Sequence, residues 1–186
     1  MSGKDREREF EVLARMEDMY EDKNPKYFNK VLGNEPSLAV RVHAVTVLSE
    51  IGDESSVPVL ASVLKNDPSS LMRHEAAFSL GQMGLKSSLP FLIDAALSDP
   101  SEIVRHESAA ALGGIGDESA RPALEKASRD TSEEVRGSAI ASLFNLDFLK
   151  FISKRKTDAN ALSKKIRASK KRKVLSSKKK KKMPSP

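Results

Sequence analysis

Histidine followed directly by glutamate occurs twice in this chain, as His74-Glu75 and His106-Glu107. Both doublets follow an arginine and lie 32 residues apart, a spacing that recurs elsewhere in the sequence. Imidazole and carboxylate groups together hold redox-active or hydrolytic metals and leave positions open for oxygen, water or substrate. The doublets therefore predict a metal site.

One doublet cannot close around a metal ion by itself, because adjacent residues of a helix point about 100° apart. Packed helices lie roughly 8 to 10 Å apart, so His74 and His106 on neighbouring helices could converge on one ion. Two imidazoles and one carboxylate would form a facial triad, the arrangement that non-haem iron uses with O₂.

Glycine stands seven residues after each histidine, at Gly81 and Gly113. Because glycine lets a ligand approach the backbone, we expect a narrow substrate arm to lie over these positions with its tip at the metal. The two outer repeats have other residues here: Ser49 and Phe144 replace the glycines, and Val42-His43 and Gly137-Ser138 replace the doublets.

A simpler interpretation of the doublets stays open. Repeats arise by duplication, so the second doublet is not an independent event, and the inner faces of solenoids carry exposed polar residues. His43 occupies a repeated position without a glutamate partner, and we expect it to be an ordinary surface or packing histidine.

Helical hairpins are the elements that must position these residues. Each unit has a short helix with a proline in its first turn, followed by a longer helix that ends at a glycine, where we expect a left-handed C-cap. A period in this range with two amphipathic helices per unit is typical of an α-solenoid. The residues repeated every 32 positions are Arg41, Arg73 and Arg105; Leu48, Leu80 and Leu112; Gly52, Gly84 and Gly116; and Pro58, Pro90 and Pro122.

The pattern predicts an all-α solenoid of about four helical hairpins. The hairpins are expected over roughly residues 25–51, 55–83, 87–115 and 119–145, after a capping helix over about 5–22. The fourth copy, after Arg136, is one residue shorter than the others.

Charge divides the chain into two parts. Residues 1–152 hold 17 Lys and Arg against 25 Asp and Glu, a net charge of −8, whereas residues 153–186 hold 15 against 1, a net charge of +14. So basic a segment cannot bury enough apolar surface to fold, and we predict a repeat domain over 1–153 and a disordered tail over 154–186. The segment from Lys170 to Val174 resembles a nuclear import signal, and the candidate nucleic-acid-binding residues of the tail are Lys170, Lys171, Arg172 and Lys173.

Composition narrows the class of protein further. The absence of cysteine excludes disulfides, thiolate zinc sites and cysteine nucleophiles. The N-terminus lacks the apolar run of a signal peptide, and no stretch approaches the roughly 20 apolar residues that cross a bilayer. We expect a cytoplasmic protein, with a nuclear location as the alternative that the tail suggests.

The segments from Arg73 to Met83 and from Val104 to Asp117 resemble the His-Glu repeats of the deoxyhypusine hydroxylase family. The resemblance covers roughly residues 36–145 and implies a HEAT-like fold. That family has two halves with two doublets each and a di-iron centre between them, and uses O₂ to hydroxylate the deoxyhypusine side chain of a translation factor. The repeats are also similar to those of phycobilin lyases, which usually lack His-Glu.

This chain resembles one half of that scaffold, which implies a homodimer with two iron ions. By the same resemblance His74, Glu75, His106 and Glu107 are iron ligands, and Glu75 and Glu107 are the catalytic carboxylates. Glu75, Gly81 and Gly113 are the expected substrate-binding residues. The acidic repeat domain suits the long cationic side chain of deoxyhypusine.

A second hypothesis is a non-catalytic HEAT-repeat adaptor that binds a protein and contacts RNA, DNA or a ribosome through its tail. About 14 excess positive charges attract phosphate strongly but read no base sequence. The tail has no aromatic residues to stack on bases. Bound iron in the purified protein would favour the hydroxylase, and a bound tetrapyrrole would favour a bilin lyase.

Overall fold

The structure is a computed structural model that describes residues 3–180, and all the secondary structure in this range is helical. Contacts divide the chain into a first unit over residues 1–146 and a second over 147–186. The predicted all-α solenoid is confirmed. The α-helices are α1 (Gly3–Glu21), α2 (Pro25–Asn34), α3 (Leu38–Ile51), α4 (Val57–Asn66), α5 (Ser70–Met83), α6 (Leu89–Ser98), α7 (Glu102–Ile115), α8 (Arg121–Ala127) and α9 (Glu133–Lys180).

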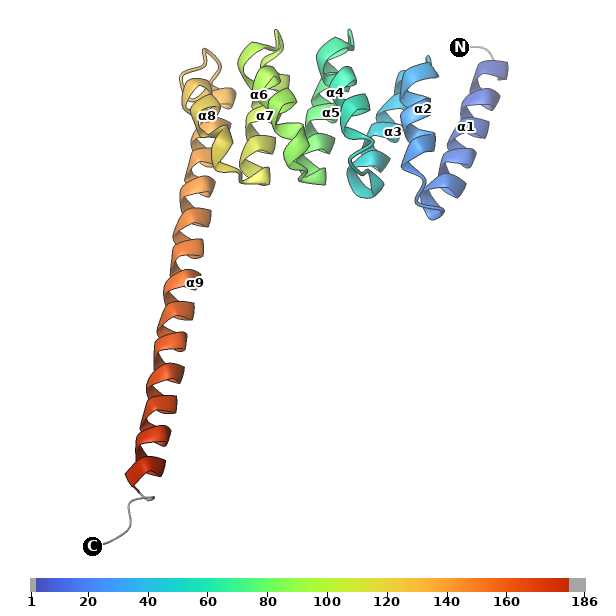
Figure 1. Cartoon of the computed structure of the whole chain (residues 1–186). Coiled ribbons are helices and arrows are strands. Elements are labelled where there is room, and N and C mark those ends of the chain that lie inside the picture. Colours follow the sequence, from blue (N-terminus) through green and yellow to red (C-terminus); the bar gives the residue numbers. More distant parts are fainter. Residues whose placement is uncertain (1–2, 181–186) are drawn as a thin grey trace, which may run out of the picture. The chain divides into compact units, whose positions relative to one another are not determined.

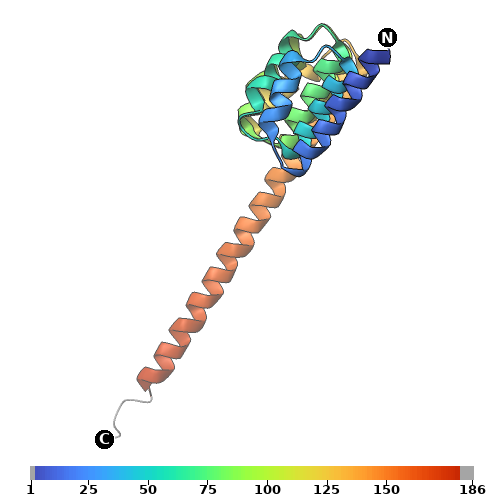
Figure 2. The ribbon, with the colours of Figure 1, turned by 90° about the vertical axis from the view of Figure 1, so that its right-hand side faces the viewer.

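The first unit is built from two layers of helices (Figure 1). The short helices α2, α4, α6 and α8 pack in succession in one layer, and α3, α5 and α7 pack in succession in the other. Helix α1 packs on α2 and α3, as expected of an N-terminal cap. Seen from the side, the hairpins stack one behind another (Figure 2).

The core uses the same repeat position in each unit. Leu48, Leu80 and Leu112 are completely buried in the hydrophobic core. The helices end less uniformly than the sequence predicts, because Gly84 and Gly116 have left-handed φ angles of 66° and 71° but Gly52 is extended at −65°. The prediction of a left-handed cap is therefore wrong for Gly52.

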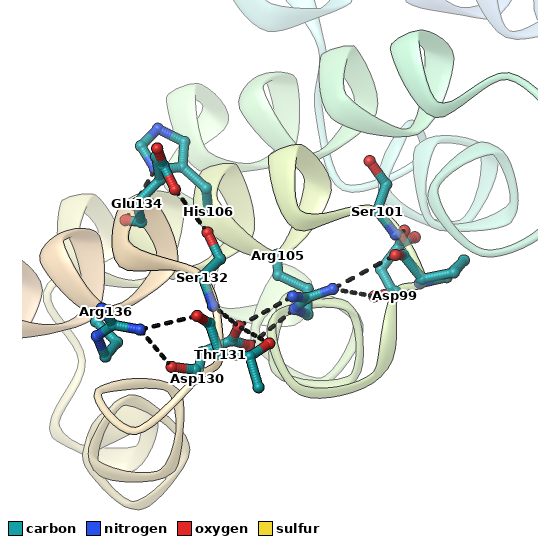
Figure 3. A network of polar contacts seen from close by, with 10 residues as sticks. Asp99, Ser101, Arg105, His106, Asp130, Thr131, Ser132, Glu134 and Arg136 are labelled. Atoms are coloured by element: carbon teal, nitrogen blue, oxygen red, sulfur yellow. Dashed lines mark hydrogen bonds and ion pairs between the residues drawn. The ribbon is translucent and has the colours of Figure 1, made fainter.

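Arginine and an acid connect each unit of the solenoid to the next. Arg73 donates from Nε and Nη2 to the carboxylate of Asp99, at 2.8 and 2.9 Å. Arg105 makes the same two bonds, at the same distances, to Asp130 (Figure 3). One unit earlier, Arg41 pairs with Asp67 of the unit that follows it. These pairs form an arginine ladder.

Each ladder arginine and acid also satisfies backbone groups at the start of a long helix. Nη1 of Arg73 donates to the carbonyl of Asp67 at 2.9 Å, and Asp99 accepts from the backbone N–H of Ser101 at 2.8 Å. Such charge-assisted bidentate bonds are stronger than neutral ones. The hydrogen bond to Asp99 raises the pKa of Arg73, and the bond from Arg105 lowers the pKa of Asp130, so the pairs stay ionised at neutral pH.

The second unit differs from the sequence prediction. Helix α9 continues without a break to Lys180, although we expected disorder from residue 154. Lysine, arginine, alanine and leucine favour helix, and residues 138–183 contain neither glycine nor proline, so nothing in the sequence ends the helix. Residues 181–186 of the predicted tail lie outside the described residues. In the described chain, no helix combines the length and the apolar character needed to cross a bilayer.

Candidate metal site

His74 lies between two carboxylates on adjacent long helices. Its Nδ1 is 3.3 Å from Oε1 of Glu75 on α5, and its Nε2 is 3.4 Å from Oε2 of Glu107 on α7. The three side chains keep between 17% and 26% of their surface exposed, so solutes can reach them. The structure thus brings together three of the four predicted metal ligands.

The arginine ladder fixes the positions of both doublets. Arg73 and Arg105 each precede a histidine directly and are locked by two bonds to an acid of the next unit. Because the next residue is turned by about 100°, a buried arginine leaves the histidine beside it partly exposed on another face. The packing of the repeats therefore determines where the imidazoles lie.

His106, on α7, has a different environment from His74, because it contacts the first residues of α9. Its Nδ1 is 3.2 Å from the backbone carbonyl of Glu134 and 2.9 Å from the hydroxyl of Ser138. Figure 3 shows the ring beside Glu134. A carbonyl only accepts, so this contact favours a proton on Nδ1 and leaves Nε2 as the nitrogen with a free lone pair.

Both histidines therefore engage Nδ1 with an oxygen acceptor, the carboxylate of Glu75 for His74 and the carbonyl of Glu134 for His106. Metal-binding histidines almost always hold their second nitrogen in this way, because the bond fixes the tautomer and the ring orientation. The sequence did not show this contact, since Glu134 lies 28 residues beyond His106.

A cavity of about 360 Å³ lies beside the two histidines. Its lining residues are His74, Glu102, Ile103, His106 and Glu134. The backbone N–H of Glu134 and the hydroxyl of Ser132, with smaller contributions from His106 and Arg136, hold the pKa of Glu134 below its usual value. The cavity therefore keeps negative charge at neutral pH and suits a cationic ligand.

Sequence reasoning missed the acidic lining of this cavity. Glu102 stands four residues before His106, a spacing that places both on one face of a helix and could have identified it. Glu134 comes from the next helix, so only the packing of α9 on α7 could reveal it.

The side chains around His74 are of the types that bind iron, but the described part of the chain holds too few of them to complete a site. Two ligands bound to one ion at about 2.0 to 2.2 Å lie roughly 3 to 3.5 Å apart, and the separation of His74 Nε2 and Glu107 Oε2 falls in that range. Among the described residues, however, no three histidines or acids are grouped so that they could hold a metal. One chain thus offers a pair of ligands rather than a closed site.

The structure corrects the role predicted for the two glycines. A Cβ on Gly81 would lie 2.6 Å from Cβ of Ala111, and one on Gly113 would lie 2.8 Å from Cα of Ser142. Both positions are contacts between neighbouring long helices instead of an open floor for a substrate. Glycine is needed there because the helices approach too closely for any side chain.

The remaining sequence candidates are His43 and the basic residues of the tail. His43 is exposed on α3 and, as expected, lies outside the cavity lining. Lys170, Lys171, Arg172 and Lys173 belong to the helical backbone of the second unit.

Comparisons with known proteins give both a family and a similar structure. The sequence model for HEAT repeats matches residues 25–112, 57–144 and 89–164. Human deoxyhypusine hydroxylase, solved in complex with glycerol, is 30% identical with a TM-score of 0.62, over 68% of this chain and 44% of that one. The predicted resemblance is confirmed, and the chain spans less than half the length of the human enzyme.

Another similar structure is the complex of CpcE and CpcF of phycocyanin lyase from Nostoc, at 18% identity and a TM-score of 0.49, over 66% of this chain and 65% of that one. A search of curated protein sequences finds no match.

Proposed function

The chain belongs to the HEAT-repeat family, and from that premise we propose that it is an iron-dependent protein hydroxylase similar to deoxyhypusine hydroxylase. The observation that carries the proposal is the 3.4 Å separation of His74 Nε2 and Glu107 Oε2, two donors on adjacent helices with the spacing of ligands on one ion. The oxygen acceptors at Nδ1 of His74 and His106 support the proposal further, because metal-binding histidines hold their second nitrogen in this way.

A second copy of the chain completes the site in this proposal. Two copies offer four histidines and four carboxylates, from His74, Glu75, His106 and Glu107 of each, and hold two iron ions per homodimer. Bound iron would supply the power to activate O₂, which no amino-acid side chain provides. The 44% coverage of the human enzyme supports the need for a second half.

The proposed substrate is the deoxyhypusine side chain of a translation factor, and the proposed location is the cytoplasm. The cavity supports this choice, because Glu102 and Glu134 would pair with the amines of a slim cationic arm. Ile103, which is 57% exposed, would contact the methylene groups between those amines. The chain itself thus binds and orients the arm, and Glu75 and Glu107 are the carboxylates beside the reacting carbon.

Elemental analysis of the purified full-length chain tests the proposal. We expect about one iron per chain, and we expect His74→Ala or Glu107→Ala to lower it at least tenfold, because loss of one ligand leaves too few donors. His43→Ala is the matched control, since His43 is exposed outside the cavity, and it should keep the full iron content.

Activity provides the second measurement. The iron-loaded protein with O₂ and a reductant should add one oxygen atom to a translation factor that carries deoxyhypusine, as read by mass spectrometry. An iron-free protein, or one whose iron is unchanged in His74→Ala and Glu107→Ala, would contradict the proposal.

The basic segment favours a second candidate, the non-catalytic adaptor that contacts RNA, DNA or a ribosome. Residues 153–186 hold 15 Lys and Arg against 1 acid, and Lys170 to Lys173 form one of the dense runs. Salt-dependent binding of RNA or DNA by an iron-free protein would support this candidate instead.

A further inference from the structure

The two ends of the arginine ladder differ. At the N-terminal end Arg8 of α1 donates to Glu35 at 2.7 and 3.3 Å, and Glu35 accepts from the backbone N–H of Ser37 at 2.9 Å. Glu35 thus makes the contacts that Asp67 and Asp99 make further along the chain. The cap helix α1 closes this end of the ladder.

The C-terminal end of the ladder is open. Arg136 donates from Nη1 to the carbonyls of Asp130 and Thr131, both at 2.9 Å, as the earlier arginines do to their own helix starts. In Arg73 and Arg105 the Nε and Nη2 groups bind an acid of the next unit. No acid among the described residues accepts a hydrogen bond from these groups of Arg136.

Apolar side chains at this end are uncovered as well. The position four residues after the ladder arginine is fully buried in Val45, Ala77 and Ala109, where the following long helix covers it. In α9 the same position is Ile140, which is 58% exposed. Phe144, at the position that Gly81 and Gly113 use for close packing, is 73% exposed.

These residues form one surface of the first unit. Glu133, Arg136, Ile140 and Phe144 follow one another at intervals of three, four and four residues along α9, so they lie on a single helix face. We call this set the α9 end face. The interface between repeats, if continued by one more helix, would cover it.

We propose that the α9 end face is the surface on which a second copy of this chain docks. The face carries both an acid and a base one turn apart, so a two-fold axis can place Glu133 of each copy near Arg136 of the other. Ile140 and Phe144 would then be buried against their counterparts. A self-complementary face of this kind favours a second copy over an unrelated partner.

The inference deepens the proposed function, because it names the surface through which the second half of the iron site associates. It rests on the proposed function only in requiring two copies of the chain, because the interface itself is inferred from how the repeats pack. The two can therefore be tested separately.

Light scattering coupled to size-exclusion chromatography, with the full-length chain in a dilution series, tests the inference both with chelator and with iron. We expect a dimer in both conditions. Phe144→Asp should raise the dissociation constant about 30-fold or more, because it places a charge at the centre of the apolar contact. Phe10→Asp is the matched control: Phe10 is 67% exposed on α1, and its substitution should leave the dimer unchanged.

A charge swap sharpens the result. Glu133→Arg should weaken the dimer, and adding Arg136→Glu to it should restore association, because the opposite charges then meet again with exchanged positions. Circular dichroism checks that each variant stays folded, since Arg136 also donates to two backbone carbonyls.

A monomeric wild-type chain in both conditions overturns the inference, and so does a dimer that Phe144→Asp leaves intact. If a dimer forms but is insensitive to Phe144→Asp and binds iron, the interface is wrong and the proposed function survives. If the dimer depends on Phe144 and binds no iron, the interface is supported and the proposed function fails.

Discussion

The long helices α3, α5, α7 and α9 share the residue type that joins one repeat to the next. The central pair, α5 and α7, differs from the outer pair, α3 and α9, at the positions beside the cavity. All four helices carry a ladder arginine, at Arg41, Arg73, Arg105 and Arg136. The two residues after it are His-Glu only in α5 and α7. Stability and chemistry therefore depend on neighbouring but separate positions.

This separation has a physical basis in burial. The side chains of Arg73 and Asp99 are only 10% and 6% exposed, whereas those of His74 and Glu75 are 26% and 24% exposed. A buried charge that loses its partner is costly, but a partly exposed one is solvated. Substitutions at the two kinds of position should consequently differ in their effect on the free energy of unfolding.

Removal of a ladder acid should have the largest effect. Asp99→Ala leaves the guanidinium of Arg73 buried without its carboxylate and removes the bond to the N–H of Ser101, so we expect a loss of about 3 kcal/mol. Asp94→Ala, at an exposed acid on α6, is the control and should change stability by less than about 0.5 kcal/mol. Equal losses of unfolding free energy in urea for the two variants would show that a ladder acid contributes no more to stability than an exposed acid does.

The next effect concerns helix approach, with two adjacent glycines as a matched pair. Gly113→Ala forces a Cβ against Ser142 and should cost about 1 to 3 kcal/mol. Gly114→Ala meets no atom within 4 Å and should stabilise the helix by about 0.5 to 1 kcal/mol. Thermal unfolding of both variants measures the difference, and a neutral Gly113→Ala would contradict the close packing of α7 on α9.

The smallest effect is expected at the site itself. His74→Ala removes a partly exposed ring that neighbours two carboxylates, so unfolding in metal-free buffer should change by less than about 1 kcal/mol. A loss comparable with that of Asp99→Ala would mean that the doublet holds the repeats together. The arginine ladder and the His-Glu doublets would then not differ in their contribution to stability.

The fold was predictable because the signals for it are local and repeated. Proline at the start of the short helices and leucine every 32 residues reflect the hairpin geometry directly, and the predicted hairpins match α2 to α7 closely. The ladder was visible only in part. The arginines recur with the repeat in the sequence. The acids that they bind lie 25 or 26 residues further on, and only the packing of the repeats shows that they are partners.

The site was less predictable, because its details depend on how one helix meets the next. The sequence identified His74 and His106 but not their different surroundings, which follow from Glu107 in one case and from Ser138 and Glu134 in the other. The glycines were misread for the same reason. A missing side chain can mark either an open surface or a close contact, and the sequence alone does not distinguish them.

The bond between Arg8 and Glu35 limits how copies of this chain can assemble. Because Arg8 of α1 already pairs with Glu35, the open ladder end of a second copy would find that acid occupied, which disfavours growth into a head-to-tail filament. The association proposed through α9 would then stop at a closed pair. In that arrangement the cap helix would keep a repeat protein with one uncovered end from forming a filament.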